Sequence, residues 1–174
     1  MTELVARTGR NRQRYEDGYR LVAGCIPYRH AKTDDEVLMI TSRSGPGLIF
    51  PKGGWENDES VEEAAQREAL EEAGVRGEMK KILGSWEFKS KSPREEDSPE
   101  GLCKAVVFPL CVTQELDSWP EQDVRQRQWL SIEDALKQCR HDWMREALEQ
   151  CREFLKQCRE ALNCCSQLSD QEQS

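Results

Sequence analysis

Runs of apolar residues separated by polar turns dominate the first half of the chain and predict β-strands. The segments LVAGCIPY (21–28) and EVLMIT (36–41) are rich in branched and aromatic residues, and the polar turn RHAKTDD separates them. Paired glycines predict a loop over 52–54, because glycine adopts backbone conformations that are closed to other residues. Further strands are predicted at 48–50, within 79–88, at 102–113 and at 128–130.

Residues 59–73 carry the pattern of a helix. Small apolar residues recur at helical intervals, and the segment contains neither Gly nor Pro. Asn57 and Asp58 are natural N-caps, and Gly74 is a natural C-terminal stop. A second, shorter helix is predicted to open at Ser131.

A third helix is predicted from 142 to about 162, with apolar positions four and three residues apart in alternation. This heptad-like stripe consists of Met144, Leu148, Cys151, Leu155, Cys158 and Leu162. We expect the stripe to pack on its own domain, so that the protein is a monomer or at most a weak homodimer. The domain is predicted to span 18–163, between a flexible basic arm over 1–17 and a disordered tail over 164–174.

Composition narrows the class of protein. The 174 residues suffice for one domain, and no run of 18 apolar residues exists that could form a transmembrane helix. The formal net charge of −8 argues against nucleic-acid binding but allows a small polyanionic substrate. Eight cysteines without a CxxC pair favour reduced thiols over a disulfide scaffold or a zinc site.

The arginines of the basic arm faintly resemble an organelle transit segment, but the arm is short and poor in serine. A cytoplasmic location is therefore expected, with the nucleus as an alternative and the mitochondrion less favoured. The arm also lacks the apolar core of a secretory signal.

Three glutamates in the first predicted helix point to metal chemistry. Glu68, Glu71 and Glu72 are spaced i, i+3 and i+4, which places them on one helix face, where they repel one another. Ion pairs with Arg67 contribute only about 0.2–0.5 kcal/mol each when exposed, too little to offset such a cluster. A divalent cation such as Mg²⁺, which prefers oxygen ligands, satisfies the cluster better. The alternative is a solvated acidic face.

The segment from Gly53 to Val75 resembles the Nudix box, Gly-x5-Glu-x7-Arg-Glu-U-x-Glu-Glu-x-Gly-U, in which U is apolar. The matching positions are Gly53, Glu59, Arg67, Glu68, Ala69, Glu71, Glu72, Gly74 and Val75. The resemblance implies an α/β fold, an α/β/α sandwich with a mixed central sheet and a catalytic loop-helix-loop. It also implies hydrolysis of a phosphoanhydride bond.

The same resemblance implies roles for the residues of the box. Glu68, Glu71 and Glu72 would bind Mg²⁺ or Mn²⁺, and Gly53 would bring a backbone oxygen near the metal. Arg67 would hold a carboxylate in place, Glu59 would support the start of the helix or bind a further ion, and Gly74 would end the helix. The general base is expected to be Glu72 or Glu71, with Glu95, Glu96 and Glu115 as alternatives.

Residues outside the Nudix-box segment indicate the expected substrate. The segment IFPKGGWENDES resembles the branch that hydrolyses diphosphoinositol polyphosphates and diadenosine polyphosphates, in particular its plant members, over roughly residues 17–137. Many basic and few aromatic residues in the loops favour the inositol pyrophosphates. A nucleotide-sugar, NADH or ADP-ribose pyrophosphatase and a catalytically silent binding module are the alternatives. The expected phosphate-binding residues are Arg20, Arg43, Lys52, Lys104, Arg125 and Arg127, with Lys89, Lys91 and Arg94 less favoured.

Overall fold

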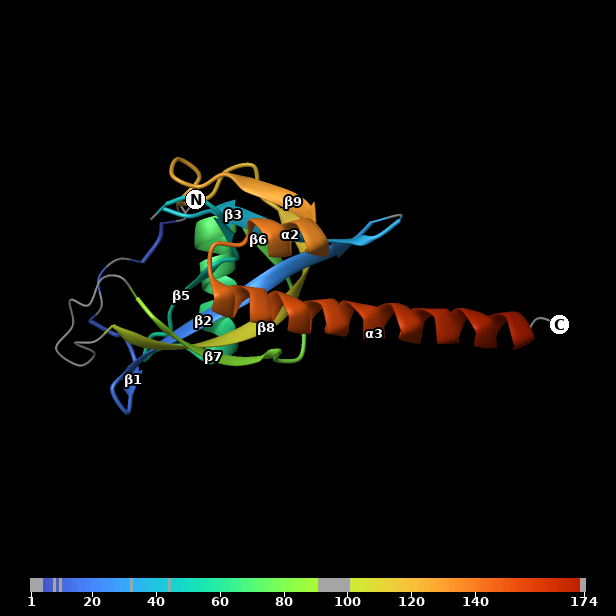
Figure 1. Ribbon diagram of the computed structural model, residues 1–174, viewed down its shortest axis with the longest axis horizontal. Helices are drawn as coiled ribbons and strands as arrows, with labels where there is room; N and C mark the ends of the chain where they lie inside the picture. The colour runs from blue at the N-terminus through green and yellow to red at the C-terminus, as the bar shows by residue number, and fades with distance from the viewer. Residues whose placement is uncertain are drawn as a thin grey trace.

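The computed structural model describes residues 5–7, 9, 11–31, 33–43, 45–90 and 101–172, with side chains described as far as residue 163. Along these residues the elements follow in the order β1 (Tyr15–Glu16), β2 (Tyr19–His30), β3 (Asp35–Thr41), β4 (Leu48–Ile49), β5 (Lys52–Gly54), α1 (Val61–Glu68), the π-helical turn η1 (Ala69–Ala73), β6 (Val75–Met79), β7 (Gly84–Lys89), β8 (Leu102–Glu115), β9 (Arg127–Ser131), α2 (Ile132–Gln138) and α3 (Asp142–Glu172). Figure 1 shows the strands gathered around β2 and β8, with α3 extending well beyond them.

A mixed sheet forms the centre of the domain, and its main path runs β4-β3-β2-β8-β6. The long strands β2 and β8 pair in parallel from Arg20↔Cys103 to Tyr28↔Cys111. The other pairings between the named strands are antiparallel: β9 lies on β3, while β6 and β7 pair with different halves of β8. The α/β class and the mixed sheet that the sequence predicted are confirmed.

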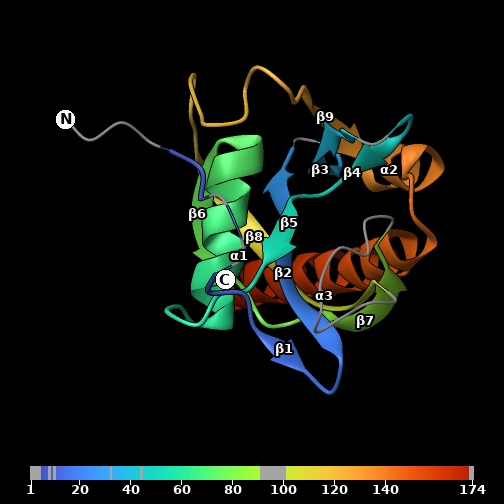
Figure 2. The same ribbon diagram turned by 90° about the vertical axis from the view of Figure 1, so that its left-hand side faces the viewer.

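Helices cover both faces of this sheet, as Figure 2 shows, with α1 on one side of β2 and β8 and α3 on the other. Successive side chains of a strand point to opposite faces. Accordingly, Cys25 in β2 lies 3.7 Å from the carbonyl oxygen of Ala65 in α1, whereas the ring of Tyr28 packs edge-on against Phe154 in α3. The core therefore has two halves, and the half under α1 carries the candidate site.

Two strand predictions need correction. Residues 52–54 form the strand β5, antiparallel to β2, where a loop was predicted. Glycines give no alternation of side chains, so the strand left no signal in the sequence. The strand predicted within 79–88 is present as β7, but β6, which ends at Met79, was not predicted; both strands pair with β8.

The structure also places residues near both ends of the chain. The arm over 1–17 was predicted to be flexible, yet the Gln13 amide donates a 2.7 Å hydrogen bond to the carbonyl of Leu21, and the Arg14 guanidinium stacks on Trp55 at 4.6 Å. At the other end, α3 continues to Glu172, through most of the segment 164–174 that was predicted to be disordered. No helix in the described part of the chain is long and apolar enough to span a bilayer.

The first half of α3 is a structural part of the domain. Met144, Leu148 and Cys151 are completely buried, and the ring of Trp143 stacks on Phe88 with centroids 4.5 Å apart. Farther along the same stripe, Leu162 is 59% exposed. The stripe predicted from the sequence thus packs on its own domain at its N-terminal end.

Replacing Leu148 by Ala is expected to lower the free energy of unfolding by about 3 kcal/mol, because the change removes buried methyl groups and leaves a cavity. Leu162→Ala on the same helix is the matched control and should change stability by no more than about 0.5 kcal/mol. Urea denaturation followed by circular dichroism measures both values. Equal effects of the two substitutions would contradict the docking of α3 on its own domain.

Candidate active site

The helix that carries the candidate site begins at a capping box. Ser60 accepts a hydrogen bond from the backbone N–H of Glu63, and the Glu63 carboxylate accepts one from the backbone N–H of Ser60. The predicted N-caps Asn57 and Asp58 therefore lie before the helix, not at its cap. At the other end Gly74 has φ 66°, a left-handed conformation that glycine adopts without steric cost, as the sequence predicted.

The last turn of this helix, η1, is π-helical and contains two of the three glutamates. Its neighbouring residues Glu71 and Glu72 are both nearly buried, at 6% and 7% exposed. Single π-turns inside α-helices occur often at functional sites. The sequence predicted an α-helix up to Ala73, since a regular apolar spacing gives no sign of one wider turn.

Arg67 is the main cation inside the cluster. Its guanidinium binds both carboxylate oxygens of Glu59, at 3.0 and 2.7 Å, and donates to the carbonyl of Gly54. The remaining nitrogen donates to Glu68 at 2.9 Å and to Glu71 at 3.2 Å. Arg67 thus joins the start of the helix, through Glu59, to the carboxylates of its last turns.

The pKa values of all three glutamates are raised, so their charged forms are disfavoured in the cluster. Burial, together with the neighbouring Glu72 carboxylate, raises the pKa of Glu68 to about 8. Burial likewise raises the pKa of Glu72 to about 7, although Lys52 and Arg125 oppose the shift. Burial also raises the pKa of Glu71. A cation bound beside these carboxyl groups would lower their pKa values and favour the loss of their protons.

Strand β5 forms the opposite wall of the cluster. A Cβ atom on Gly53 would lie 2.2 Å from the Glu68 carboxylate, so only glycine allows the strand to come this close. The backbone N–H of Lys52 donates a 3.1 Å hydrogen bond to Glu72. The glycine that begins the predicted motif is therefore placed directly against one of the predicted metal ligands.

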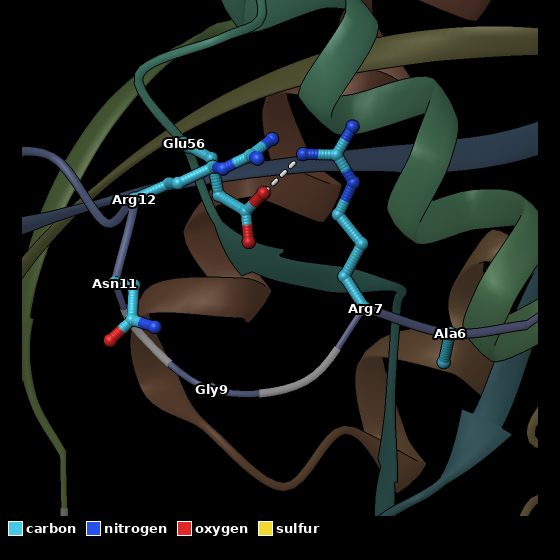
Figure 3. Close-up of a pocket in the computed structure, with 6 residues that line it drawn as sticks. All are labelled: Ala6, Arg7, Gly9, Asn11, Arg12 and Glu56. Carbon is cyan, nitrogen blue, oxygen red and sulfur yellow. Dashed lines mark hydrogen bonds and ion pairs between the residues drawn. The ribbon is translucent and has the colours of Figure 1, made fainter.

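The N-terminal arm lies beside the cluster of glutamates, next to Glu71. The backbone N–H of Arg7 donates to Glu71 at 3.1 Å, and its guanidinium pairs with Glu56 and Asp58. Arg12 also binds Asp58, at 2.8 Å. Figure 3 shows Arg7 reaching Glu56 beside a pocket of about 470 Å³ that the arm and Glu56 enclose.

The arrangement fits a divalent cation. Among the described residues no three acidic, histidine or cysteine side chains already converge in metal-binding geometry. Donors of the chain itself bind the carboxylate oxygens of Glu68, Glu71 and Glu72. Yet three nearly buried carboxylates with raised pKa values need more positive charge than Arg67, Lys52 and Arg125 supply. Carboxylate oxygen is the ligand type that Mg²⁺ and Mn²⁺ prefer.

A returning loop, residues 116–126, closes the cluster from the side. Arg125 is 9% exposed and binds Glu72 at 3.4 Å, Glu121 at 3.3 Å and the carbonyl of Thr41. Glu121 is a fourth acidic residue at the cluster, and its charge raises the pKa values of Glu71 and Glu72 further. No sequence pattern pointed to Glu121, which lies far from the motif along the chain.

The expected phosphate-binding residues fall into two groups. Arg43 is 61% exposed with its guanidinium 3.8 Å from Glu121, Lys52 borders the cluster on β5, and Arg20 lies near Gly54. Lys104 is exposed on β8, opposite Glu87 of β7. In contrast, the guanidinium groups of Arg125 and Arg127 bind atoms of the chain itself. The phosphate-binding role of these two residues stays a prediction.

The alternative general bases receive less support. Glu115 accepts hydrogen bonds from the Trp129 indole and pairs with Arg127 at 3.5 Å. Glu95 and Glu96 lie outside the described residues, as do Lys91 and Arg94. Glu71 and Glu72 are thus the predicted bases that lie inside the described cluster.

The sheet, the glycine strand and the glutamate helix together define a class of phosphoanhydride hydrolase. A family model described as "NUDIX domain" matches residues 18–151. The chain belongs to the Nudix family. Nudix hydrolases act on small-molecule phosphoanhydride substrates and generally need a divalent metal ion, so the predicted enzyme class is confirmed.

Relatives and solved structures agree with this assignment. "Nudix hydrolase 16, mitochondrial" of Arabidopsis thaliana is 61% identical, with 85% of this chain and 88% of that protein aligned. "Diphosphoinositol polyphosphate phosphohydrolase 3-alpha" of Mus musculus is 34% identical, over 78% of this chain and 80% of that protein. A crystal structure of an Ap4A hydrolase of C. elegans matches with TM-score 0.59 and 23% identity, covering 78% of this chain and 97% of that one, which shows a shared fold.

The expected cytoplasmic location is wrong. The relative at 61% identity is named as mitochondrial, and so is "Nudix hydrolase 12, mitochondrial" of Arabidopsis thaliana, 51% identical over 86% of this chain and 81% of that protein. The arginines of the N-terminal arm were the sequence signal that pointed to an organelle.

Proposed function

We propose that this enzyme hydrolyses phosphoanhydride bonds of diphosphoinositol polyphosphates in a Mg²⁺-dependent reaction, with diadenosine polyphosphates as secondary substrates. The observation that carries the proposal is the cluster of Glu68, Glu71 and Glu72, nearly buried and short of positive charge. Basic side chains that remain available for a ligand, Arg43 and Lys52, border this cluster. The 34% identity to a mouse diphosphoinositol polyphosphate phosphohydrolase supports the substrate class.

In this proposal Glu68, Glu71 and Glu72 hold Mg²⁺, and Mn²⁺ can replace it. The bound ion would polarise phosphate oxygens and lower the pKa of a water molecule. Arg67 keeps the Glu68 and Glu71 carboxylates oriented through its two hydrogen bonds. We assign to Glu72 the role of accepting the proton of the attacking water, because this carboxylate lies inside the cluster.

The aromatic residues favour an inositol over an adenine ligand. An arginine already covers one face of three tryptophan rings, with Arg14 on Trp55, Arg29 on Trp129 and Arg127 on Trp119. Trp143 is stacked on Phe88. Adenine recognition relies on free aromatic faces or specific hydrogen bonds, whereas a polyphosphorylated ring needs cations.

A substrate panel tests the proposal. Purified enzyme with Mg²⁺ is incubated separately with a diphosphoinositol polyphosphate, diadenosine tetraphosphate, ADP-ribose, NADH and a nucleotide sugar, and products are separated by chromatography. The highest kcat/KM is expected for the diphosphoinositol polyphosphate. A higher kcat/KM for ADP-ribose, NADH or the nucleotide sugar would replace the proposed substrate class, and inactivity on the whole panel would favour a binding module.

Arg43→Glu is expected to raise KM by about tenfold or more for the diphosphoinositol polyphosphate, since it removes a charged hydrogen-bond donor near the site and adds repulsion. The increase should be smaller for a substrate with fewer phosphates. Arg152→Glu, which alters an arginine on α3 that is 46% exposed, is the control and should leave KM unchanged. An equal rise for all substrates would argue against a phosphate-binding role for Arg43.

A further inference from the structure

Hydrogen-bond donors from outside the helix bind the last carbonyl groups of η1, the turn that carries Glu71 and Glu72. The last carbonyl groups of a helix have no partner within it, so they need donors from elsewhere. Glu71 O accepts the backbone N–H of Glu121 at 3.0 Å, and Glu72 O accepts the Trp119 indole N–H at 3.1 Å. Ala73 O accepts a guanidinium N–H of Arg127 at 3.0 Å. All three donors come from residues 119–127.

Trp119 and Arg127 hold each other in place. The Arg127 guanidinium lies 4.0 Å from the centre of the Trp119 ring, a cation–π contact. The same guanidinium donates to the carbonyl of Leu116 at 2.6 Å and to that of Gly74 at 3.3 Å. The pair is therefore fixed both to the returning loop and to the end of the helix, and its polar groups are already used within the chain.

The backbone that this pair holds is the backbone of a π-turn, a winding that rarely persists without support. Glu71 and Glu72 lie on this turn and are nearly buried, whereas Glu68 lies on the preceding α-helix. A loss of the donor to Glu72 O would leave a carbonyl without its partner and would let the winding of residues 69–73 change. A changed winding would shift the Glu71 and Glu72 carboxylates relative to that of Glu68.

We propose that Trp119 and Arg127 form a positioning pair for the metal site, holding the turn that presents Glu71 and Glu72 without touching substrate. The inference rests on the proposed metal-dependent function. It gives Arg127 a role distinct from phosphate binding. A phosphate-binding Arg127 would act on KM, whereas a positioning Arg127 acts on metal affinity and kcat.

Trp119→Phe tests the pair most directly, because phenylalanine keeps a ring beside Arg127 but lacks the indole N–H. The matched control is Trp129→Phe. Trp129 is also half-buried and lies under Arg29 at 4.2 Å, and its indole N–H donates to Glu115, a partner of Arg127, rather than to a carbonyl of the glutamate turn. Mn²⁺ binding to the full chain is measured by the electron paramagnetic resonance signal of free Mn²⁺. Thermal unfolding is recorded alongside for each variant.

Trp119→Phe is expected to weaken Mn²⁺ binding about 3- to 10-fold and to lower kcat by a similar factor, with KM for substrate unchanged at saturating metal. Arg127→Lys, which keeps the charge but loses the planar fork, should act in the same direction. Trp129→Phe should bind Mn²⁺ like the wild type.

Two results would overturn the inference while leaving the proposed function intact. One is a Mn²⁺ affinity of Trp119→Phe equal to that of Trp129→Phe. The other is an Arg127→Lys variant with raised KM and unchanged Mn²⁺ affinity. A wild-type protein that binds no Mn²⁺ would instead overturn the proposed function, and the positioning role with it.

Discussion

Glu71→Gln is expected to lower Mg²⁺-dependent turnover by about 100-fold or more, while the protein stays folded, because the amide keeps the size of the side chain but cannot supply a charged metal ligand. Glu71 is 6% exposed and lies between Arg67 and the backbone of Arg7, so its shape is retained and only its charge is lost. Steady-state kinetics across a range of Mg²⁺ concentrations measures the effect.

The matched control for this substitution is Glu62→Gln on the same helix. Glu62 is exposed in the first turn and faces away from the cluster, so its replacement should leave kcat and the Mg²⁺ dependence unchanged. If Glu71→Gln turned over substrate at the wild-type rate, the assigned metal role of this residue would be wrong.

Metal-free protein is expected to lose stability between pH 5 and pH 8, on the order of 2 kcal/mol in the free energy of unfolding. Glu68 and Glu72 have folded-state pKa values raised to about 8 and about 7, well above those of an exposed glutamate. In this pH window the folded state binds more protons than the unfolded state, so stability falls as pH rises. Saturating Mg²⁺ at pH 8 should restore it, because the ion binds the folded state.

Urea denaturation in the presence of a chelator, repeated at several pH values, measures this dependence. Glu68→Gln removes the carboxyl group with the more strongly raised pKa and should flatten the decline. A free energy of unfolding that stays constant or increases from pH 5 to pH 8 would show that the carboxylates are already neutralised within the chain.

The sequence predicted the parts of the site that lie close together along the chain. Helical spacing was enough to place Glu68, Glu71 and Glu72 on one face, and the spacing from Gly53 to Gly74 identified the motif. Strand prediction succeeded where apolar residues form long runs, as in β2 and β8. These features depend on local periodicity, which a single sequence contains.

What the sequence missed depends on contacts between distant segments. Arg127 was expected to bind phosphate, since nothing in its neighbourhood shows that its partners are the carbonyls of Ala73, Gly74 and Leu116. Glu121 went unnoticed for the same reason. The arm was judged flexible because a short polar segment has no pattern of its own, although Arg7 reaches the glutamate cluster.

The parallel pairing of β2 with β8 has a consequence for folding kinetics. Arg20 pairs with Cys103, which lies 83 positions later in the chain. A long loop must therefore close before β2 and β8 can pair. The walls of the glutamate cluster depend on that ladder: β5 joins it through β2, and the segment with Trp119 follows β8. The predicted ligands of a divalent ion therefore come together only after this loop has closed. Such an ion should slow unfolding without accelerating refolding.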